Sequence, residues 1–266
     1  MLKKILRKHP LLASIAMIAM RKQIILINKD KDGDYEIKHK LGSYFSASPF
    51  SWFTKPEQEL FEYNYACKAG DTTLIIGVED GHELLYYCRQ CNPGKVFAIE
   101  PTKECVRRIL KMKRRNKLNN LVVIEVAIGS MNNNSVSFTS AVTGDDLTNT
   151  LTDYCQIENG KTVQVKMERL DSVIESNSIH HIDYMKINIE GAELDALKSL
   201  GKHAKIVDNI CVSCHDFIAP ALRTYDTVME WLNGNGFEIF NHSFTMIRPW
   251  ENYYLFGKRI EGTSKN

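Results

Sequence analysis

The sequence predicts an α/β protein: a mostly parallel sheet, covered by helices on both faces, that ends in an antiparallel hairpin. Three observations lead to this prediction. Short apolar, β-branched runs alternate with segments of helical spacing from about residue 71 onward, glycines stand where strands turn into helices, and two strand-like segments close the chain. Repeated strand–helix units form parallel sheets with right-handed crossovers, which places helices on both faces.

The individual elements follow from β-branched runs, helical spacing and Gly or Pro breaks such as Asn92-Pro93-Gly94. The expected strands are Thr72–Ile76, Val96–Ile99, Leu121–Ile128, Thr162–Met167, Tyr184–Ile189, Ile206–Ser213, Phe237–Phe240 and Tyr253–Arg259. The expected helices are Pro56–Lys68, Gly81–Gln90, Lys103–Lys117, Ala192–Leu200 and Asp226–Leu232. Thr54 is the expected N-cap of the first helix, with Pro56 just inside its start.

Three segments do not fit the strand–helix alternation. Lys29 to Lys40 is polar, with Asp32-Gly33, and is expected to form a turn or loop. The aromatic segment Tyr44–Phe53 and the polar excursion Ser130–Asn159 are candidates for a lid over an acceptor. We therefore divide the chain into an extension of helices and loops (1–70), the main domain (71–260) and a short tail (261–266).

Composition limits the classes of partner. The chain has 266 residues and is 44% hydrophobic, enough for one domain and a modest extension. Its 34 basic and 32 acidic side chains give a net charge of +2, whereas a protein that binds nucleic acid without sequence preference carries a larger basic excess. We expect no nucleic-acid partner. The basic residues Lys111, Lys113, Arg114, Arg115 and Lys117 are interpreted as a solvated helix end.

The N-terminal segment has a basic start, Lys3 to His9, followed by the apolar run Leu11–Met20. Ten residues are too few to span a bilayer, which needs about 20. No A-x-A-like cleavage site follows, so a signal peptide is not favoured. Two interpretations stay open: a basic amphipathic helix in peripheral contact with an anionic membrane, or a helix packed on the domain. We favour the second.

The cysteines argue against a disulfide scaffold and against zinc. Seven is an odd number at low density, which is typical of a reducing compartment, so we expect a cytoplasmic protein. The pairs Cys88/Cys91 and Cys211/Cys214 have C-x-x-C spacing. The first pair is expected late in a helix, and residues three apart on a strand face opposite sides, so the second pair cannot chelate one tetrahedral ion. We expect no metal site.

A nucleotide-like ligand is indicated where the first strand ends in Gly77-Val78-Glu79-Asp80-Gly81. Ligands of open α/β sheets bind outside the carboxyl ends of the strands, and Glu100 at the end of the second strand can accept hydrogen bonds from ribose hydroxyls. A nicotinamide dinucleotide is the alternative. It is disfavoured because G-x-G-x-x-G is absent and because Glu79 and Asp80 would repel a pyrophosphate, but not a cofactor with a sulfonium and an amine.

Four motifs of the sequence together resemble a known family. Gly77-x-x-x-Gly81, Phe97–Pro101, Leu170-Asp171 and Met185–Leu194 together are similar to the FkbM family of methyltransferases, over roughly Asp71 to His215. The resemblance implies a Rossmann-like class I methyltransferase sheet, S-adenosyl-L-methionine as cofactor, and O-methylation of sugars, glycolipids or polyketide-like products. The residues that it implies around the cofactor are Gly77, Glu79, Gly81, Glu100, Pro101 and Ala127.

The chain departs from the family pattern at three positions. The family usually has an acid at the position of Ile75, Asn at the position of Glu79, and Asp at the position of Asn188. These departures motivate a second hypothesis, a protein with the methyltransferase fold that has lost its chemistry and acts as a binding module.

Candidate catalytic residues follow the strand that contains Lys186. Lys186, Asn188 and Glu190 alternate with isoleucines and so share one face, where three buried polar groups would be costly without a function. The alternative is a buried ion pair between Lys186 and Glu190. Asn188 cannot act as a base but can position a hydroxyl of a small-molecule or glycan acceptor, so the base is His215 or Glu190.

The expected places of the histidines in the sheet separate them into two groups. His215 ends the next strand and is expected to titrate near neutrality, with Asp216 orienting it or binding the acceptor. His180 and His181 precede a strand, so they are expected on the surface at the opposite end of the sheet.

Overall fold

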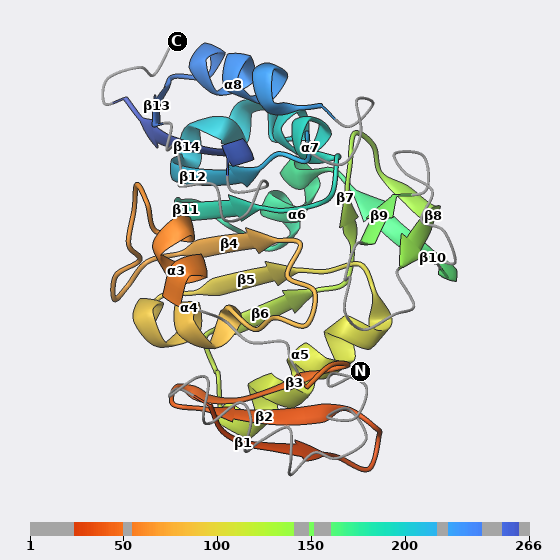
Figure 1. Cartoon of the computed structure of the whole chain (residues 1–266). Helices are drawn as coiled ribbons and strands as arrows, with labels where there is room; N and C mark the ends of the chain where they lie inside the picture. Colours follow the sequence, from red (N-terminus) through yellow and green to blue (C-terminus); the bar gives the residue numbers. More distant parts are fainter. Residues whose placement is uncertain are drawn as a thin grey trace.

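The structure is a computed structural model of the whole chain, and it describes residues 24–49, 55–140, 149–151, 161–216, 223–240 and 252–260. A seven-stranded sheet with the order β13-β14-β12-β11-β4-β5-β6 forms its centre (Figure 1). Its strands are β4 (Thr73–Ile76), β5 (Val96–Ile99), β6 (Leu121–Ile124), β11 (Ile182–Ile187), β12 (Val207–Ser213), β13 (Phe237–Phe240) and β14 (Tyr254–Arg259). Within this sheet, the neighbouring strands β6, β5, β4, β11 and β12 pair in parallel. Strand β14 is antiparallel to both of its neighbours, β12 and β13. The predicted mostly parallel sheet with a C-terminal antiparallel hairpin is confirmed.

Helices cover both faces of this sheet because alternate strand residues point to opposite sides. The helices are α3 (Lys55–Phe61), α4 (Leu84–Cys91), α5 (Lys103–Asn116), α6 (Leu170–Ser176), α7 (Glu193–Ser199), α8 (Tyr225–Gly234) and the 3₁₀ helix η1 (Gly201–Ile206). Ile75 of β4 belongs to the core that includes side chains of α3, α4 and α5. Its neighbours Leu74 and Ile76 belong to the core that includes side chains of α6, α7 and α8.

A smaller sheet lies beside the carboxyl ends of the central strands, in the order β7-β10-β8-β9. It comprises β7 (Ala127–Ile128), β8 (Asn133–Ser140), β9 (Asn149–Leu151) and β10 (Lys161–Glu168). The single strand predicted over Leu121–Ile128 is wrong, because the chain leaves the central sheet after Ile124 and pairs Ala127 with Met167. The excursion after Ser130 contains two strands rather than only a loop. Only Val136 and Phe138 of β8 join a core, and this accounts for the polar composition of the strand.

A third sheet precedes α3 and consists of β1 (Ile24–Lys29), β2 (Tyr35–His39) and β3 (Gly42–Ser46). The turn or loop predicted over Lys29–Lys40 is wrong in its extent: a turn connects β1 to β2 around Asp32-Gly33, but Tyr35–His39 form a strand in which Ile37 is fully buried. Ion pairs fix this sheet to α5. Lys111 Nζ lies 2.6–2.7 Å from carboxylate oxygens of Asp30, Asp32 and Asp34. Lys111 is thus not part of a solvated helix end.

Some predictions lie wholly or partly outside the described residues. These are the basic N-terminal segment, the Thr54 cap, and parts of the two candidate lid segments. The helix predicted over Pro56–Lys68 ends earlier, at Phe61. No helix in the described part of the chain is long and apolar enough to cross a bilayer. The domain division and the cytoplasmic location stay predictions.

Candidate functional site

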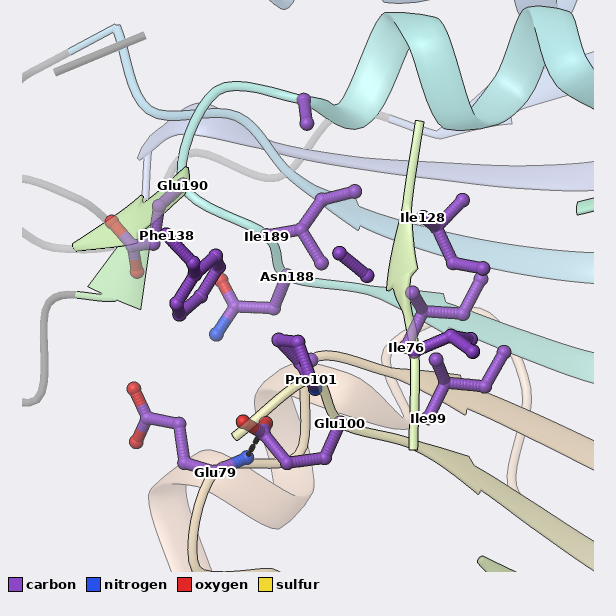
Figure 2. A pocket seen from close by; sticks show the side chains of 14 residues that line it. Ile76, Glu79, Ile99, Glu100, Pro101, Ile128, Phe138, Asn188, Ile189 and Glu190 are labelled. Atoms are coloured by element: carbon purple, nitrogen blue, oxygen red, sulfur yellow. Dashed lines mark hydrogen bonds between the residues drawn. The ribbon is translucent and has the colours of Figure 1, made fainter. Parts of the chain in front are cut away.

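A pocket lies outside the carboxyl ends of β4, β5 and β11 and beside the small sheet (Figure 2). Its lining residues are Ile76, Gly77, Glu79, Ile99, Glu100, Pro101, Val126, Ala127, Ile128, Phe138, Asn188, Ile189, Glu190 and Ala192. All but one of the predicted cofactor residues are among them. The exception is Gly81, which packs between Leu84 and Ile109 and shapes the turn before α4.

Gly77, directly after β4, lies against the backbone that follows β11. Its φ of +77° lies in the left-handed region, and a Cβ atom there would stand 1.9 Å from the Asn188 carbonyl oxygen. Only glycine fits both conditions, because it has no Cβ and tolerates positive φ. Gly77 therefore permits both the tight turn after β4 and the close approach of the chain's own backbone at Asn188.

Glu100 is buried at the tip of β5, and its carboxylate holds the loop after β4. Oε2 accepts a hydrogen bond from the Glu79 N–H at 2.9 Å. Oε1 accepts bonds from the Thr102 N–H at 3.0 Å and from the Thr102 hydroxyl at 2.7 Å. Burial raises the pKa of Glu100 to about 7, although these three bonds act to lower it. The structure therefore brings Glu100 beside the Gly77–Gly81 loop, as the sequence requires.

Glu79 and Asp80 are neighbours with different surroundings. Glu79 has a φ of +48°, lines the pocket, and its carboxylate has no hydrogen-bond or ion-pair partner in the described part of the chain. Burial and the nearby carboxylates of Glu190 and Glu100 raise its pKa well above the usual value. Asp80 instead points away and accepts bonds from Ser46 Oγ at 2.6 Å and Arg108 at 2.7 Å.

The residues after β11 separate into two groups. Asn188 and Glu190 line the pocket, and Glu190, like Glu79, has a left-handed backbone with φ +54°. Lys186 is buried below them, with Nζ 2.9 Å from Glu83 Oε1 and 4.1 Å from the ring centre of Phe61. The alternative pairing of Lys186 with Glu190 is wrong, because Glu83 is its partner.

This pairing explains how the chain accommodates Ile75. The strand register places Ile75 directly beside Lys186. An acid at position 75 would stand next to the lysine, whereas in this chain Glu83 supplies the carboxylate from the start of α4. The resulting ion pair is almost fully buried, with side-chain exposures of 3% for Lys186 and 2% for Glu83.

His215 is held between two carboxylates. Its Nε2 lies 3.1 Å from Glu190 Oε1, and its Nδ1 lies 2.7 Å from Glu193 Oε1. Burial lowers the pKa of His215, but the two carboxylates outweigh it and raise the pKa to about 10. The ring is therefore charged at neutral pH, and the expectation that it titrates near neutrality is wrong. Asp216 does not orient His215. Its carboxylate accepts hydrogen bonds from the N–H groups of Thr224 and Tyr225 at the start of α8.

Glu193 was missed by sequence reasoning. It is fully buried, and its carboxylate accepts bonds from the Gly191 N–H at 3.1 Å while holding His215. Its position inside the block Glu190-Gly191-Ala192-Glu193 could have indicated this role, because a carboxylate that follows a glycine turn can bond the N–H groups of that turn.

A second pocket of about 180 Å³ continues from the first. Its lining residues are Glu57, Leu60, Phe61, Gly77, Val78, Glu79, His82, Glu83, Lys186, Asn188 and Tyr254. The two pockets meet at Gly77, Glu79 and Asn188, which line both. Lys186, predicted as a site residue, belongs to this second pocket.

The cysteine and aspartate groups with metal-like spacing, and the two adjacent histidines, lie outside the two pockets. Cys211 and Cys214 belong to opposite cores, which confirms that they face different sides of β12. Asp30, Asp32 and Asp34 form a group with metal-like spacing, but the ammonium of Lys111 lies among them. His180 and His181 are exposed, as predicted.

Comparisons with known proteins agree with this geometry. The profile of the methyltransferase FkbM domain matches residues 76–239. The chain belongs to the FkbM methyltransferase family. This membership confirms the predicted family. It also confirms the prediction that the chain is a methyltransferase with S-adenosyl-L-methionine as its cofactor. A comparison with curated protein sequences gives no significant match.

Solved structures of similar fold are also methyltransferases. A candidate rRNA methylase from Clostridium thermocellum aligns with a TM-score of 0.51 at 10% identity, over 79% of this chain and 100% of that chain. Precorrin-6y C5,15-methyltransferase from Geobacter metallireducens gives 0.46 at 10% identity, over 79% and 95%. Aeropyrum pernix fibrillarin with bound S-adenosyl-L-methionine gives 0.45 at 10% identity, over 90% and 99%. At such identities the likeness concerns the fold alone.

Proposed function

We propose that this FkbM-family methyltransferase O-methylates a hydroxyl group of a sugar, glycolipid or related metabolite. One observation carries the proposal: the strand tips bring Gly77, Glu79, Glu100, Asn188 and Glu190 into one pocket. A nucleoside-binding part and a set of polar groups suited to an acceptor hydroxyl are thus adjacent.

The first pocket fits the adenosine part of the cofactor. Ile99, Val126 and Phe138 provide apolar walls for a base, and Glu100 provides a carboxylate for the ribose. A carboxylate has about four acceptor positions, of which Glu100 uses three in the structure, so one stays open for a ribose hydroxyl. When bound, S-adenosyl-L-methionine supplies an electrophilic methyl group on a sulfonium. The second pocket extends the cleft beyond Asn188 and adds room that cofactor and acceptor require together.

Glu190 is the proposed base. A hydroxyl is a poor nucleophile unless a nearby group removes its proton. Glu190 faces the pocket with a side-chain exposure of 16%, whereas His215 is 3% exposed and already protonated at neutral pH. The Glu190 carboxylate takes the hydroxyl proton, His215 positions that carboxylate, and the Asn188 amide holds the hydroxyl oxygen.

The competing function is a binding module without catalysis. Asn188 cannot accept a proton, and the charged ring of His215 cannot act as a base, so two of the four candidate catalytic residues lack base chemistry.

The charge of His215 can be measured directly. A neutral His215 at pH 7, observed by NMR of the imidazole, would contradict the assignment of the base to Glu190.

Calorimetry with S-adenosyl-L-homocysteine tests the proposal first. Saturable binding is expected, and its absence would exclude the enzyme. Transfer of a labelled methyl group to a panel of glycosides, glycolipids and peptides then separates enzyme from binding module. Glu190→Gln should reduce transfer by at least about 100-fold, since general base catalysis contributes about 10²–10⁴, and should leave product binding within about twofold. Glu104→Gln, on the exposed first turn of α5, is the matched control.

A further inference from the structure

We propose that Glu79 makes this site bind the sulfonium form of the cofactor, S-adenosyl-L-methionine, in preference to its neutral product, S-adenosyl-L-homocysteine. The inference rests on the proposed function of the pocket as the cofactor site. It assigns to one carboxylate a selectivity for charge that the rest of the site does not provide.

The first observation is the place of Glu79. Together with Gly77 and Asn188 it lines both pockets, so it stands where the adenosine side of the cleft meets the remainder. Its backbone N–H donates a hydrogen bond to Glu100 Oε2 at 2.9 Å. Its side chain extends into the cleft on the same side as Glu190 (Figure 2). The sulfur of the cofactor joins the adenosine part to the amino-acid part, and Glu79 would lie beside this junction in the bound state.

The second observation is the strained backbone that presents this side chain. Glu79 and Glu190 both have left-handed φ values, of 48° and 54°, in loops that follow neighbouring strands. Glutamate rarely adopts this conformation, and strained residues of this kind cluster at ligand sites. The fold therefore holds two carboxylates at the mouth of one pocket in spite of their mutual repulsion.

The third observation is the missing counter-charge. The acids that line the two pockets are Glu57, Glu79, Glu83, Glu100 and Glu190. Lys186 is the lysine among the lining residues, and Glu83 already binds it at 2.9 Å. His82, the histidine among them, also lies beside Glu83, with Nε2 3.6 Å from Oε2. His215 lies between Glu190 and Glu193. Glu79 itself has no cationic partner among the described residues, while the carboxylates of Glu190 and Glu100 face it from neighbouring elements. A cationic ligand beside Glu79 relieves this repulsion.

The two cofactor forms differ in the property that Glu79 can detect. They share adenine, ribose and the amino-acid end, whereas the sulfur carries a positive charge only before the methyl group leaves. A carboxylate in a partly desolvated cleft distinguishes a charged from a neutral sulfur through the Coulomb interaction, which is stronger there than in water. Loss of the charge during transfer would then weaken the hold on the product.

Calorimetric dissociation constants at pH 8 test the proposal for S-adenosyl-L-methionine, S-adenosyl-L-homocysteine and 5′-methylthioadenosine, which lacks both the sulfonium and the amino-acid end. We expect the unchanged protein to bind the sulfonium form about tenfold more tightly than the product. Glu79→Gln should reduce this preference to within about twofold by weakening only the sulfonium ligand, and Glu79→Asn, which tolerates positive φ better, should do the same. Glu104→Gln should keep the preference.

Two results would overturn the inference. An equal loss for both cofactor forms in Glu79→Gln would show that Glu79 binds the α-ammonium group that they share. Product binding as tight as that of the sulfonium form in the unchanged protein would show that no charge selectivity exists. Absence of binding by all three ligands would instead refute the cofactor site itself, and so the proposed function.

Discussion

Glu79 and Asp80 follow one another in the chain, but their carboxylates belong to two different kinds of acidic cluster. Asp80 is fully buried and accepts bonds from Ser46 and from Arg108, which itself also binds Asp34. Glu79 faces the pocket and has no such partner in the described part of the chain. Of these two adjacent acids, Asp80 is paired with an arginine of the protein and holds the fold, whereas Glu79 faces the pocket without a cationic partner among the described residues.

The same contrast extends to the neighbours of each residue. Burial raises the pKa of Asp34, but hydrogen bonds from Arg107, Lys111 and Arg108 outweigh it, so the net pKa lies well below its usual range. At the strand tips burial dominates, and the pKa of Glu100 is raised to about 7. Acids that hold the fold together have cationic partners, whereas Glu79 and Glu100 at the pocket have none among the described residues.

The largest expected effect comes from removing a counter-charge of the buried cluster. Arg108→Met leaves Asp80 buried and without its strongest partner, and breaking such a pair costs about 3–5 kcal/mol. Urea denaturation should show this loss in the free energy of unfolding. If the variant is as stable as the unchanged protein, Asp80 is not held by Arg108 and the contrast with Glu79 fails.

A smaller effect is expected at the pocket, and it should concern binding rather than stability. Glu100→Gln removes a carboxylate that accepts hydrogen bonds, and bonds to charged groups contribute about 1.5–3 kcal/mol, or roughly ten- to hundredfold in affinity. Calorimetry with S-adenosyl-L-homocysteine measures this loss. The thermal unfolding midpoint serves as the control, and a large drop in it with unchanged affinity would assign Glu100 to the structural class of acids.

The raised pKa of Glu100 predicts a pH dependence of binding. A carboxyl with a pKa of about 7 is mostly protonated at pH 6 and mostly ionised at pH 8, so the form that accepts hydrogen bonds increases about tenfold over this range. The affinity for S-adenosyl-L-homocysteine should therefore rise with pH between these values and be lost as pH falls through 7. In Glu100→Gln the rise should nearly vanish; if it persists there, another group controls it.

The smallest effect is expected for an exposed pair on the same helix as Arg108. Arg115 Nε lies 2.8 Å from Glu36 Oε1, but its side chain is 50% exposed. Arg115→Met should change the free energy of unfolding by less than about 1 kcal/mol, since exposed ion pairs contribute little. Its comparison with Arg108→Met isolates burial as the cause, because both substitutions remove one arginine of α5 that binds the N-terminal sheet.

The sequence predicted the central sheet because its strands are short apolar runs bounded by glycines, as at Ile76-Gly77. It also predicted that Glu100 lies beside that glycine turn, since the carboxyl ends of parallel strands share one edge. It did not predict β8, whose alternation of Ser, Thr and Asn with Val136 and Phe138 has the composition of a loop. A strand of this kind is recognised only once its partner β10 is known.

Long-range partners account for the other differences. Glu83 binds Lys186 from 103 residues away, and the choice between Glu83 and Glu190 depends on the direction in which the lysine side chain leaves the sheet. The charge state of His215 depends on two carboxylates, one of which, Glu193, has no distinguishing feature as a single residue. Such pairings require the strand register, which the pattern of a single sequence does not contain.

The close contact between the first third of the chain and the central sheet bears on where a minimal functional fragment could begin. The family match starts at residue 76, but Ser46 bonds Asp80, the Phe61 carbonyl accepts the buried Tyr184 hydroxyl at 2.7 Å, and α3 supplies one wall of the second pocket. A polypeptide shortened to the matched segment would lose these contacts, most of β4 and all of β14, and with them the sheet that positions the glycine turn and Glu100. Under the proposed function, the α3 side chains that line the second pocket are where acceptor choice can change without any change at the cofactor.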